Sequence, residues 1–591
     1  MVRDVPAAVC LLAVHATMLA WSGYRHSPTI DEPAHLAAGI SHWQFGHMDL
    51  YSVNPPLVRM IAALPVLAAK PETAWGQFRR ASQSRAEFQV GEAFADANGP
   101  RIFWLITLAR WSCIPFSLLG GWVCFQWARE LFGAASGLLS LTLWCFSPTI
   151  LGNAALITAD VPAASLCVTT LYLFFHWLRR PSWATCYLTA VGLGIALLTK
   201  SSLILLCGLL PVLWATVRLL GRNPEVGPNG LRADVSKRRQ TLQLTTMVVI
   251  AMLVLNLGYG FEGSFTQLKE FSFRSQALGG DHDGRRSSVR GNRFSESWTG
   301  SVPIPLPANY VIGIDAQKYD FETGLRSYLL GEIKTAGEGW WWFYLYAAAV
   351  KVPLGTWVLA FLTVPVAGRW GRADQQLLLI GPALCFASVV SSQVGLNFFR
   401  YLLPAFPFAF IWISQLLSDR IGNRSRISLT LTALGLLWSI ASSLWYFPHS
   451  LAYFNELVGG PKSGYRIMVD ANLDWGQDLL YLKEWLEDHP EAAGMELHYY
   501  GPVAPVLAGL PVTDVTSRKD RLSLPDGSPE PSSGPSKWVA VSVTRIAHQT
   551  AFHRRHGGQG ENWFADLFER EPDDRIGYSI HLYRNGEDAA K

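Results

Sequence analysis

Apolar runs of about twenty residues recur along the chain, separated by short polar breaks. A helix needs roughly 20 apolar residues to cross the ~30 Å hydrocarbon core of a bilayer. The runs therefore predict a polytopic α-helical membrane protein with about 11 transmembrane helices. The run from 184 to 220 is too long for one helix, so we divide it at Lys200. The predicted spans are 5–24, 103–127, 134–150, 161–178, 184–199, 202–220, 242–260, 341–367, 376–392, 402–417 and 427–447.

Composition agrees with a lipid environment. Of the 591 residues, 50% are hydrophobic and only 16% are charged, whereas soluble domains carry about 25% charged residues. The net charge of +4 argues against a nucleic-acid-binding protein. All 8 cysteines fall inside predicted spans, so we expect no disulfide framework.

The distribution of basic residues predicts the orientation. Cytoplasmic connections are enriched in Lys and Arg, and one set of short connections carries nearly all of them. The opposite set holds only Lys200 and Arg400. We therefore expect the N-terminus in the cytoplasm. The basic connections contain Arg129, Arg179, Arg180, Arg222, Lys237, Arg238, Arg239, Arg369, Arg372, Arg420, Arg424 and Arg426.

This orientation divides the chain into two domains. Residues 1–447 form the membrane domain, and residues 448–591 form an extracytoplasmic C-terminal domain. Within the membrane domain, the long loops 25–101 and 261–340 lie on the outer side, and we expect helices in them.

The first outer loop contains the most informative segment. Pro33 follows two carboxylates, Asp31 and Glu32, which is typical of a helix N-terminus. On a helix over 31–46, Leu36, Ile40 and Trp43 share one side, and Asp31, His35 and His42 share the other. Such a helix would lie at the membrane surface and direct its polar side into a cavity.

Three interpretations of these polar residues remain open. Asp31 can cap the helix while Glu32 complements its dipole. The two carboxylates can instead do chemistry. A third interpretation is a divalent metal site built from Asp31, His35 and His42, although three ligands on one helical face usually need a fourth from elsewhere.

A proline pair interrupts the same loop. Asn54-Pro55-Pro56-Leu57 precedes a second apolar segment, 57–69, which is too short to span the bilayer. We expect this segment to lie in the interface. The diproline is most simply a rigid turn.

Further ionisable residues gather toward the outer side. Asp160 precedes span 161–178, Lys200 lies between two spans, and Arg400 precedes span 402–417. Lys351 lies about ten residues into its span, roughly 15 Å along the helix. Charges at this depth are costly, so we expect Lys351 to face the protein interior or a wet cavity.

The second outer loop carries a basic stretch at 285–290 and three tryptophans at 340–342. The basic stretch is interpreted as a solvated loop or as a lid over an anionic ligand. The tryptophans are typical of an interfacial aromatic belt.

The tail predicts a small α/β domain. Strands are expected at 465–469, 537–543 and 577–583, with helices at 477–488 and 562–569. A Pro/Ser/Gly-rich linker covers 525–536. Asp474 and Trp475 lie in a strand-to-helix loop, where open α/β sheets bind ligands. Asp474 can cap the following helix or recognise a substrate, and Trp475 can stack on a sugar ring.

The ordered set of outer motifs resembles one family. An acidic pair after the first span, an x-Pro-Pro-Leu element and a many-spanning body with an outer domain are similar to polyprenyl-phosphate-dependent glycosyltransferases of the C-type membrane fold. These include protein O-mannosyltransferases (the glycosyltransferase 39-like group) and aminoarabinose transferases of lipid A. Further matching segments are Thr158-Ala159-Asp160, Leu198-Thr199-Lys200, Lys351-Val352-Pro353-Leu354 and Arg400-Tyr401-Leu402-Leu403-Pro404.

The resemblance implies a protein of the bacterial inner membrane. It also implies an inverting transfer of a sugar from a polyprenyl-phosphate donor to an acceptor hydroxyl at the outer face. Asp31 would act as general base, with Glu32 beside it. Cations would stabilise the charge on the leaving phosphate. The implied phosphate-binding residues are Lys200, Lys351, Arg400 and Tyr401, and the substrate-binding candidates are Asn54, Asp160, Asp474 and Trp475.

Two departures from the family pattern limit what it implies. Aminoarabinose transferases carry an acidic-basic pair before the proline that contributes to metal and phosphate binding, whereas this chain has Val53-Asn54. The resemblance therefore implies no metal by that route. The repeated outer module of eukaryotic protein mannosyltransferases is missing from the sequence, which weakens the case for a protein as acceptor. The acceptor remains open among a lipid, a glycan and a protein.

Two other function classes agree less well with the sequence. A transporter or flippase for a lipid-linked sugar would be expected to show internal repeats with matching broken helices, and the sequence shows no clear repeat. A membrane scaffold would not explain so many ionisable groups on one side.

Overall fold

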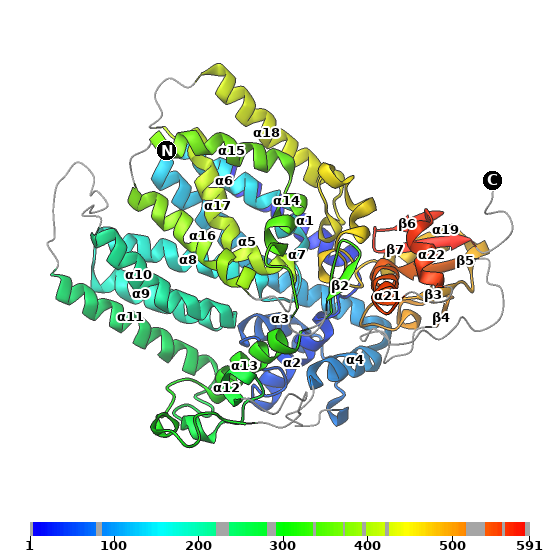
Figure 1. Ribbon diagram of the computed structural model, residues 1–591, viewed down its shortest axis with the longest axis horizontal. Coiled ribbons are helices and arrows are strands. Elements are labelled where there is room, and N and C mark those ends of the chain that lie inside the picture. The colour runs from blue at the N-terminus through cyan, green and yellow to red at the C-terminus, as the bar shows by residue number, and fades with distance from the viewer. Residues whose placement is uncertain are drawn as a thin grey trace.

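The computed structural model describes residues 4–77, 85–219, 236–280, 291–324, 326–334, 338–369, 373–392, 397–419, 425–515, 538–557 and 562–584. A body of long helices occupies most of the molecule, and a small mixed sheet with its own helices lies against one side of it (Figure 1).

Eight helical segments among these residues are long and apolar enough to cross a membrane, and a bent pair raises the number to nine. These eight correspond to eight of the predicted spans. They contain α1 (Asp4–Arg25), α5 (Ile102–Phe132), α8 (Asp160–Arg179), α10 (Leu205–Leu219), α11 (Lys237–Gly258), α16 (Ala373–Ser392), α17 (Phe406–Ser414) and α18 (Arg426–Trp445).

The other three predicted spans are also helical, but shorter or broken. They correspond to α6 (Ala134–Cys145), α9 (Trp183–Leu197) and the pair α14 (Phe343–Lys351) and α15 (Leu354–Arg369). The pair bends by 110° at Val352-Pro353, because proline lacks the amide hydrogen that a continuing helix requires. The predicted fold class, a multi-pass helical membrane protein with a small C-terminal α/β part, is confirmed.

The bend changes the expected place of Lys351. The sequence predicted a position within a straight span, whereas Lys351 is the last residue of α14, directly at the break. It is 5% exposed, so the expectation that it faces the protein interior is confirmed.

The first outer loop folds into three packed helices: α2 (Glu32–Phe45), α3 (Leu57–Ala68) and α4 (Ala86–Asn98). Two glycines allow the close approach. A Cβ on Gly39 would lie 2.1 Å from the Arg59 carbonyl oxygen of α3, and one on Gly91 would lie 2.5 Å from the Ala34 amide nitrogen of α2. The loop is therefore a compact helical layer.

This packing overturns the expected surface helix over 31–46. Leu36 and Ile40 are buried as predicted, but His35 and His42 on the opposite side are buried too. Trp43, expected on the buried side, is 48% exposed, and its indole nitrogen donates a hydrogen bond to the Met60 carbonyl oxygen. The reason is that α3 and α4 cover α2 from two sides.

The second outer loop contributes α12 (Gln276–Gly279), α13 (Ala308–Thr323) and an antiparallel hairpin of β1 (Ser327–Leu329) and β2 (Glu332–Lys334). The basic stretch at 285–290 lies outside the described residues. Of the tryptophans, Trp340 is buried and Trp341 is 70% exposed.

The C-terminal sheet has the strand order β4-β3-β5-β7-β6. Strands β4 (Thr513–Asp514) and β5 (Trp538–Ser542) run parallel to β3 (Glu496–His498). Strand β7 (Ile580–Arg584) runs antiparallel to both β5 and β6 (Asp574–Ile576). Three helices accompany the sheet: α19 (Leu479–Asp488), α21 (Val543–Arg555) and α22 (Trp563–Glu569).

Most elements predicted for the tail are present, with one exception. The expected strand at 465–469 is wrong, because Pro461–Arg466 forms 3-10 turns (η10) and the following residues join no sheet. Ile467, Met468 and Val469 are nevertheless buried, so their apolar character reflects burial in a connector. The predicted linker 525–536 lies outside the described residues.

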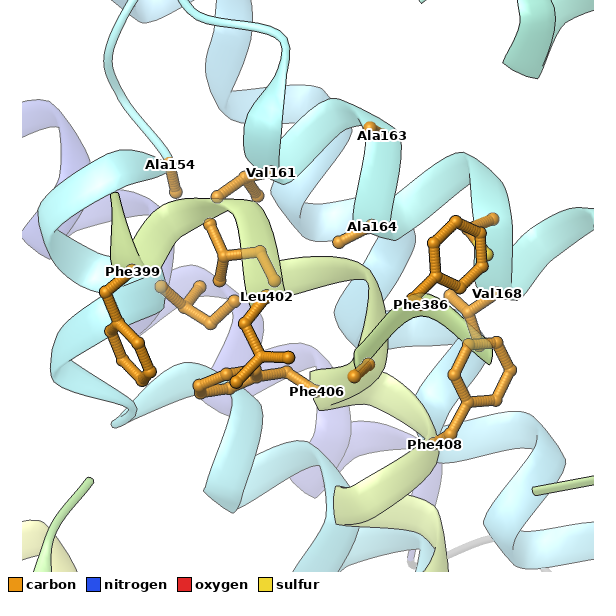
Figure 2. Close-up of a cluster of buried hydrophobic side chains, with 14 of the residues drawn as sticks. Ala154, Val161, Ala163, Ala164, Val168, Phe386, Phe399, Leu402, Phe406 and Phe408 are labelled. Atoms are coloured by element: carbon orange, nitrogen blue, oxygen red, sulfur yellow. The ribbon is translucent and has the colours of Figure 1, made fainter. Parts of the chain in front are cut away.

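A buried apolar cluster fixes the segment that carries Arg400. This segment is η6 (Phe399–Ala405), which leads into α17, and its side chains interlock with those at the start of α8 (Figure 2). Arg400 and Asp160 lie directly beside members of this cluster in the sequence, so its packing sets their relative position. Figure 2 labels Ala154, Val161, Ala163, Ala164, Val168, Phe386, Phe399, Leu402, Phe406 and Phe408.

Candidate active site

Three charged side chains from distant helices form a buried cluster. The Lys200 Nζ lies 2.5 Å from Asp160 Oδ1, and the Arg400 Nε lies 3.2 Å from Asp160 Oδ2. All three residues are less than one-tenth exposed. Asp160 begins α8, Lys200 lies at the break between α9 and α10, and Arg400 lies in η6. Helix ends and breaks therefore carry the charges that the sequence predicted to gather on one side.

Asp31 extends this cluster. Arg400 Nη2 lies 3.4 Å from Asp31 Oδ2, and the Asp31 side chain is 20% exposed. Asp31 occupies the N-cap position of α2 but makes no capping hydrogen bond with its side chain. Burial raises the pKa of Asp31 above its ordinary value, while the charges of Arg400 and Arg85 oppose the rise. The capping interpretation is thus not realised, and Asp31 is an acid held beside a cation.

Two aromatic rings border the cations. The Lys200 Nζ lies 4.5 Å from the centre of the Tyr401 ring, and the Arg400 guanidinium lies 4.0 Å from the centre of the Trp475 ring. Both distances are within the range of a cation–π interaction. Trp475 is 2% exposed, so the C-terminal domain closes the cluster from one side.

Several buried polar atoms around the cluster have no hydrogen-bond partner within the described part of the chain. Two of these atoms are Nε and Nη1 of Arg400. Nε forms an ion pair with Asp160 but no hydrogen bond of good geometry. The others are the side-chain amide of Asn397, the Thr158 hydroxyl and the side-chain oxygen Oδ1 of Asn54. Buried polar groups are normally paired, so these atoms are suited to bind the polar groups of a ligand.

A cavity of about 240 Å³ opens beside Lys200 and Tyr401. Apolar side chains from several helices make most of its wall, including Leu205 of α10, Ile314 and Phe321 of α13, and Val389 of α16. The full set of lining residues is Lys200, Ser201, Ser202, Ile204, Leu205, Ile314, Gln317, Lys318, Phe321, Tyr344, Val389, Val390 and Tyr401. The cavity wall is therefore mostly apolar, and its two cationic lining residues are Lys200 and Lys318.

The turn predicted at 54–57 is hydrogen-bonded to the residues on both sides of Lys200. The Leu57 amide donates to the Leu198 carbonyl oxygen at 3.1 Å, and the Ser201 hydroxyl donates to the Val53 carbonyl oxygen at 3.1 Å. These bonds hold the diproline turn on both sides of Lys200. Asn54 itself is half-buried, with its carbonyl oxygen unpaired among the described residues.

Glu32, the second acid of the pair, has a different environment. Its carboxylate receives two bonds from Arg110, at 2.8 and 2.5 Å, and both side chains are completely buried. It also accepts hydrogen bonds from the Thr29 and Ile157 amides. With no exposed surface and this many donors, Glu32 holds the structure together and is not free to act on a substrate. Sequence reasoning missed Arg110, although an arginine inside span 103–127 is a signal for a buried partner.

Lys351 is also already bonded. Its ammonium donates to the carbonyl oxygens of Leu451 and Asn472 and lies 4.4 Å from the centre of the Phe454 ring. Asn472 in turn accepts a hydrogen bond from the Phe399 amide at 2.9 Å. Lys351 therefore fastens the connector 451–472 next to η6, so its position supports Arg400 instead of forming a phosphate site of its own.

Asp474 is committed to the C-terminal domain. Its carboxylate accepts a hydrogen bond from the Thr544 amide at 3.0 Å, in the first turn of α21. Burial raises its pKa to about 7. The carboxylate caps a helix, as one interpretation of the sequence had it, but that helix is α21 and not α19. The expectation that Asp474 binds substrate has no support from this geometry.

The histidines considered for a metal site do not come together with Asp31. His42 Nε2 accepts a hydrogen bond from Arg59 at 2.8 Å, and His42 Nδ1 lies 2.9 Å from the His47 carbonyl oxygen. His35 packs edge-on against Tyr51. Both ring nitrogens of His42 are used, so a metal held by Asp31, His35 and His42 does not fit this structure.

Two further charged groups lie nearby. Asp470 stood out in the sequence only as one of several polar residues in the 470–478 loop, and Arg85 did not stand out. Asp470 lies close enough to feel the charge of Arg400, and burial raises its pKa to about 6. It is held by a hydrogen bond with the Tyr500 side chain. Arg85, whose charge also acts on Asp31, lies 2.6 Å from Asp320 Oδ2 of α13. Arg85 belongs to no motif, so only the fold reveals it.

One family model matches part of the chain. Residues 105–223 match the model for dolichyl-phosphate-mannose-protein mannosyltransferases. The resemblance predicted from the motifs is confirmed for this part of the chain. No curated protein sequence matches.

Solved structures are similar over longer stretches. ArnT from Cupriavidus metallidurans bound to undecaprenyl phosphate is 14% identical, with 97% of each chain covered and a TM-score of 0.44. The same protein in the apo state is 12% identical, with 98% of this chain and 97% of that chain covered and a TM-score of 0.45. An oligosaccharyltransferase from Archaeoglobus fulgidus is 12% identical, with 74% of this chain and 54% of that chain covered and a TM-score of 0.38.

Proposed function

We propose that this protein is an integral membrane glycosyltransferase that moves a sugar from a polyprenyl-phosphate donor to an acceptor hydroxyl at the outer face of the membrane. The family match over residues 105–223 supports a glycosyltransferase. The observation that carries the proposal is that the Asp31–Asp160–Lys200–Arg400 cluster borders a largely apolar cavity through Lys200.

The cavity suits a lipid-linked donor. Its apolar wall would take the first isoprene units of the donor, and Lys200 and Tyr401 at its end would meet the phosphate. Arg400 adds a guanidinium with two nitrogens that lack a hydrogen-bond acceptor among the described residues. Guanidinium and ammonium groups bind phosphate strongly. A phosphate between Lys200 and Arg400 would also compete with Asp160 for both cations.

The reaction would be a single displacement with inversion. Asp31 takes the proton of the acceptor hydroxyl while the oxygen attacks the anomeric carbon. The bond from that carbon to the phosphate oxygen breaks, and polyprenyl phosphate leaves. A positioned base contributes typically 10²–10⁴ in rate, and the cations stabilise the charge that develops on the leaving oxygen.

The acceptor side would be formed by the C-terminal domain. Trp475 covers Arg400 and would present its ring edge to a sugar or to the acceptor. Asp160, beside Arg400, would orient hydroxyl groups. The acceptor class we propose is a lipid, glycan or protein that carries a hydroxyl. The termini would be oriented as the basic connections predict, with residues 448–591 outside the cytoplasm.

The test compares two adjacent acids in purified protein supplied with polyprenyl-phosphate-linked hexoses. Asp31→Asn should reduce transfer and hydrolysis of the donor by about 10²-fold or more, with an unchanged melting temperature. Glu32→Gln should instead lower the melting temperature, since loss of one partner of a buried ion pair costs about 3–5 kcal/mol. Near wild-type turnover by Asp31→Asn would refute the base assignment.

The same assay separates an enzyme from a flippase. An enzyme consumes the sugar–phosphate bond, which mass spectrometry of the lipid detects, whereas a flippase moves the donor intact across reconstituted vesicles. Movement of intact donor without any cleavage would refute the proposed function.

A further inference from the structure

A second polar cluster lies at the junction of the membrane body and the C-terminal domain. His26 follows α1, His449 follows α18, and Asp478 directly precedes α19. One ligand atom from each residue lies within 4.8 Å of the others. His449 Nδ1 is 3.3 Å from Asp478 Oδ1, and His26 Nε2 is 3.8 Å from the same oxygen. Three segments far apart in the sequence thus direct ligand-type atoms at one point.

The hydrogen bonds of His26 show which of its nitrogens is available. His26 Nδ1 lies 2.9 Å from the Ser22 carbonyl oxygen, which can only accept. Nδ1 therefore carries the hydrogen. In the neutral ring, Nε2 has a lone pair, and this lone pair faces the Asp478 Oδ1 oxygen. Two acceptors that face each other are repulsive unless a proton or a metal ion lies between them.

Burial makes this arrangement costly without a cation. Asp478 is completely buried, and its Oδ1 has no hydrogen-bond partner among the described residues; the same is true of His449 Nδ1. Asp478 Oδ2, by contrast, accepts a weak bond from Gln477 at 3.3 Å. The nearby charge of Arg110 is balanced by Glu32, so it does not neutralise Asp478. An unpaired carboxylate oxygen in such a place points to a missing positive partner.

We propose that His26, His449 and Asp478 form a structural binding site for a divalent transition-metal ion such as zinc. Bonds of about 2.0–2.2 Å from Zn²⁺ to nitrogen and oxygen ligands place neighbouring tetrahedral ligands roughly 3.3–3.6 Å apart, which is close to the spacing observed here. Water would fill the remaining position. A cavity of about 20 Å³ borders His26 and Gln477, and this volume accommodates one water molecule.

The residues around the three ligands favour a structural role. Tyr481 packs against both histidine rings, with ring centres 5.3 Å from His26 and 4.7 Å from His449. A Cβ on Gly577 would lie 2.2 Å from the Asp478 carboxyl carbon, so the turn after β6 closes tightly over the ligand. A metal here would tie the ends of α1 and α18 to the first helix of the C-terminal domain. The inference does not depend on the proposed glycosyl transfer.

The test measures metal content in full-length protein that is purified in detergent without a histidine tag. After chelation and dialysis against micromolar zinc sulfate, wild-type protein should retain one zinc per chain. Both His449→Ala and Asp478→Asn should weaken zinc binding by more than about 100-fold, since changes outside the ligand shell already cost about 10–100-fold. His556→Ala alters an exposed histidine at the end of α21 and should retain the full equivalent.

Thermal unfolding gives an independent readout. Zinc should raise the melting temperature of chelated wild-type protein and of His556→Ala, but not that of His449→Ala. Less than one-tenth of an equivalent in wild-type protein would overturn the proposal, as would equal zinc retention by wild type and His449→Ala. If Asp478→Asn fails to fold, His449→Ala decides the matter, because His449 lies closer to the surface.

Discussion

Asp31 and Glu32 are adjacent in the sequence, yet their carboxylates meet different partners. Glu32 is enclosed by Arg110 and backbone amides. The Asp31 side chain is one-fifth exposed, and its Oδ2 lies 3.4 Å from Arg400 Nη2. The difference arises from partners that are distant in the sequence. Arg110 lies 78 positions from Glu32, and Arg400 lies 369 positions from Asp31. A buried pair serves stability and an accessible acid beside a cation can do chemistry. At the scale of single residues, partners distant in the chain therefore decide function.

The environment of Asp31 leads to a pH prediction. Its pKa is raised by burial above the ordinary value of 3.8, so the deprotonated base is lost at a higher pH than for an exposed aspartate. As the pH falls, kcat/KM should decline with a midpoint above 3.8. The positive charge of Arg85 lowers this pKa, and Arg85→Gln should therefore move the midpoint to still higher pH.

The matched control for this profile is Arg293→Gln, which removes an exposed arginine that donates to the Ala277 carbonyl oxygen in the second outer loop. Its midpoint should equal that of wild type. A downward shift of the midpoint in Arg85→Gln would contradict the electrostatic argument.

The sequence predicted the members of the site better than their roles. Asp31, Asp160, Lys200, Arg400 and Tyr401 converge as expected, because charges next to apolar spans have few places to go. Lys351, Asp474 and His42 were also candidates in the sequence, but their hydrogen bonds go to other parts of the protein. Spacing along one chain cannot show such partners, since they come from other elements.

At the scale of elements, interruptions of helices place the site. Lys200 lies where α9 gives way to α10, Arg400 lies in a 3-10 segment before α17, and Asp160 starts α8. Hydropathy predicted these interruptions because polar residues break apolar runs. It could not show the 110° bend between α14 and α15, which depends on packing. It also could not show that α2 is covered on two sides.

Helix α2 carries Asp31 at its start, and its packing gives a second prediction. Gly39→Ala would place a methyl group 2.1 Å from the Arg59 carbonyl oxygen. Overpacking of this kind costs about 1–3 kcal/mol, so the melting temperature and the activity should both fall. Gly208→Ala in α10 is the control, since a methyl group added there would have no neighbour within 4 Å among the described residues. It should be neutral or slightly stabilising. Equal melting temperatures for the two variants would argue against close α2–α3 packing.

At the scale of the whole molecule, the C-terminal domain is continuous with the membrane body. The Ser27 and Ile30 amides donate to the Gln477 and Trp475 carbonyl oxygens. In the same segment, the Asp474 carboxylate accepts a hydrogen bond from the Thr544 amide in the first turn of α21. In Figure 1 the sheet lies beside α1 and the outer-loop helices, on the side away from the N-terminus. The existence of this domain was predictable from strand and turn patterns. Its docking was not, because docking depends on backbone hydrogen bonds.

Asp474 provides a test of how the segment that pairs with residues 27–30 is anchored inside the C-terminal domain. Asp474→Ala would leave the Thr544 amide without its acceptor, and an unsatisfied buried donor costs about 1–3 kcal/mol. The melting temperature should fall, and hydrogen exchange in α21 should become faster. Asp488→Ala, at the exposed end of α19, should change neither. Unchanged exchange in α21 of Asp474→Ala would show that the cap is dispensable.

The pairing of residues 27–30 with 475–477 has a consequence for biosynthesis. Asp31 emerges from the ribosome near the start of translation, but its neighbours Arg400 and Trp475 follow hundreds of codons later. A nascent chain can therefore insert its early helices long before a competent centre exists. Products of premature termination before codon 475 would be integrated yet would lack the proposed centre, and so would be inert.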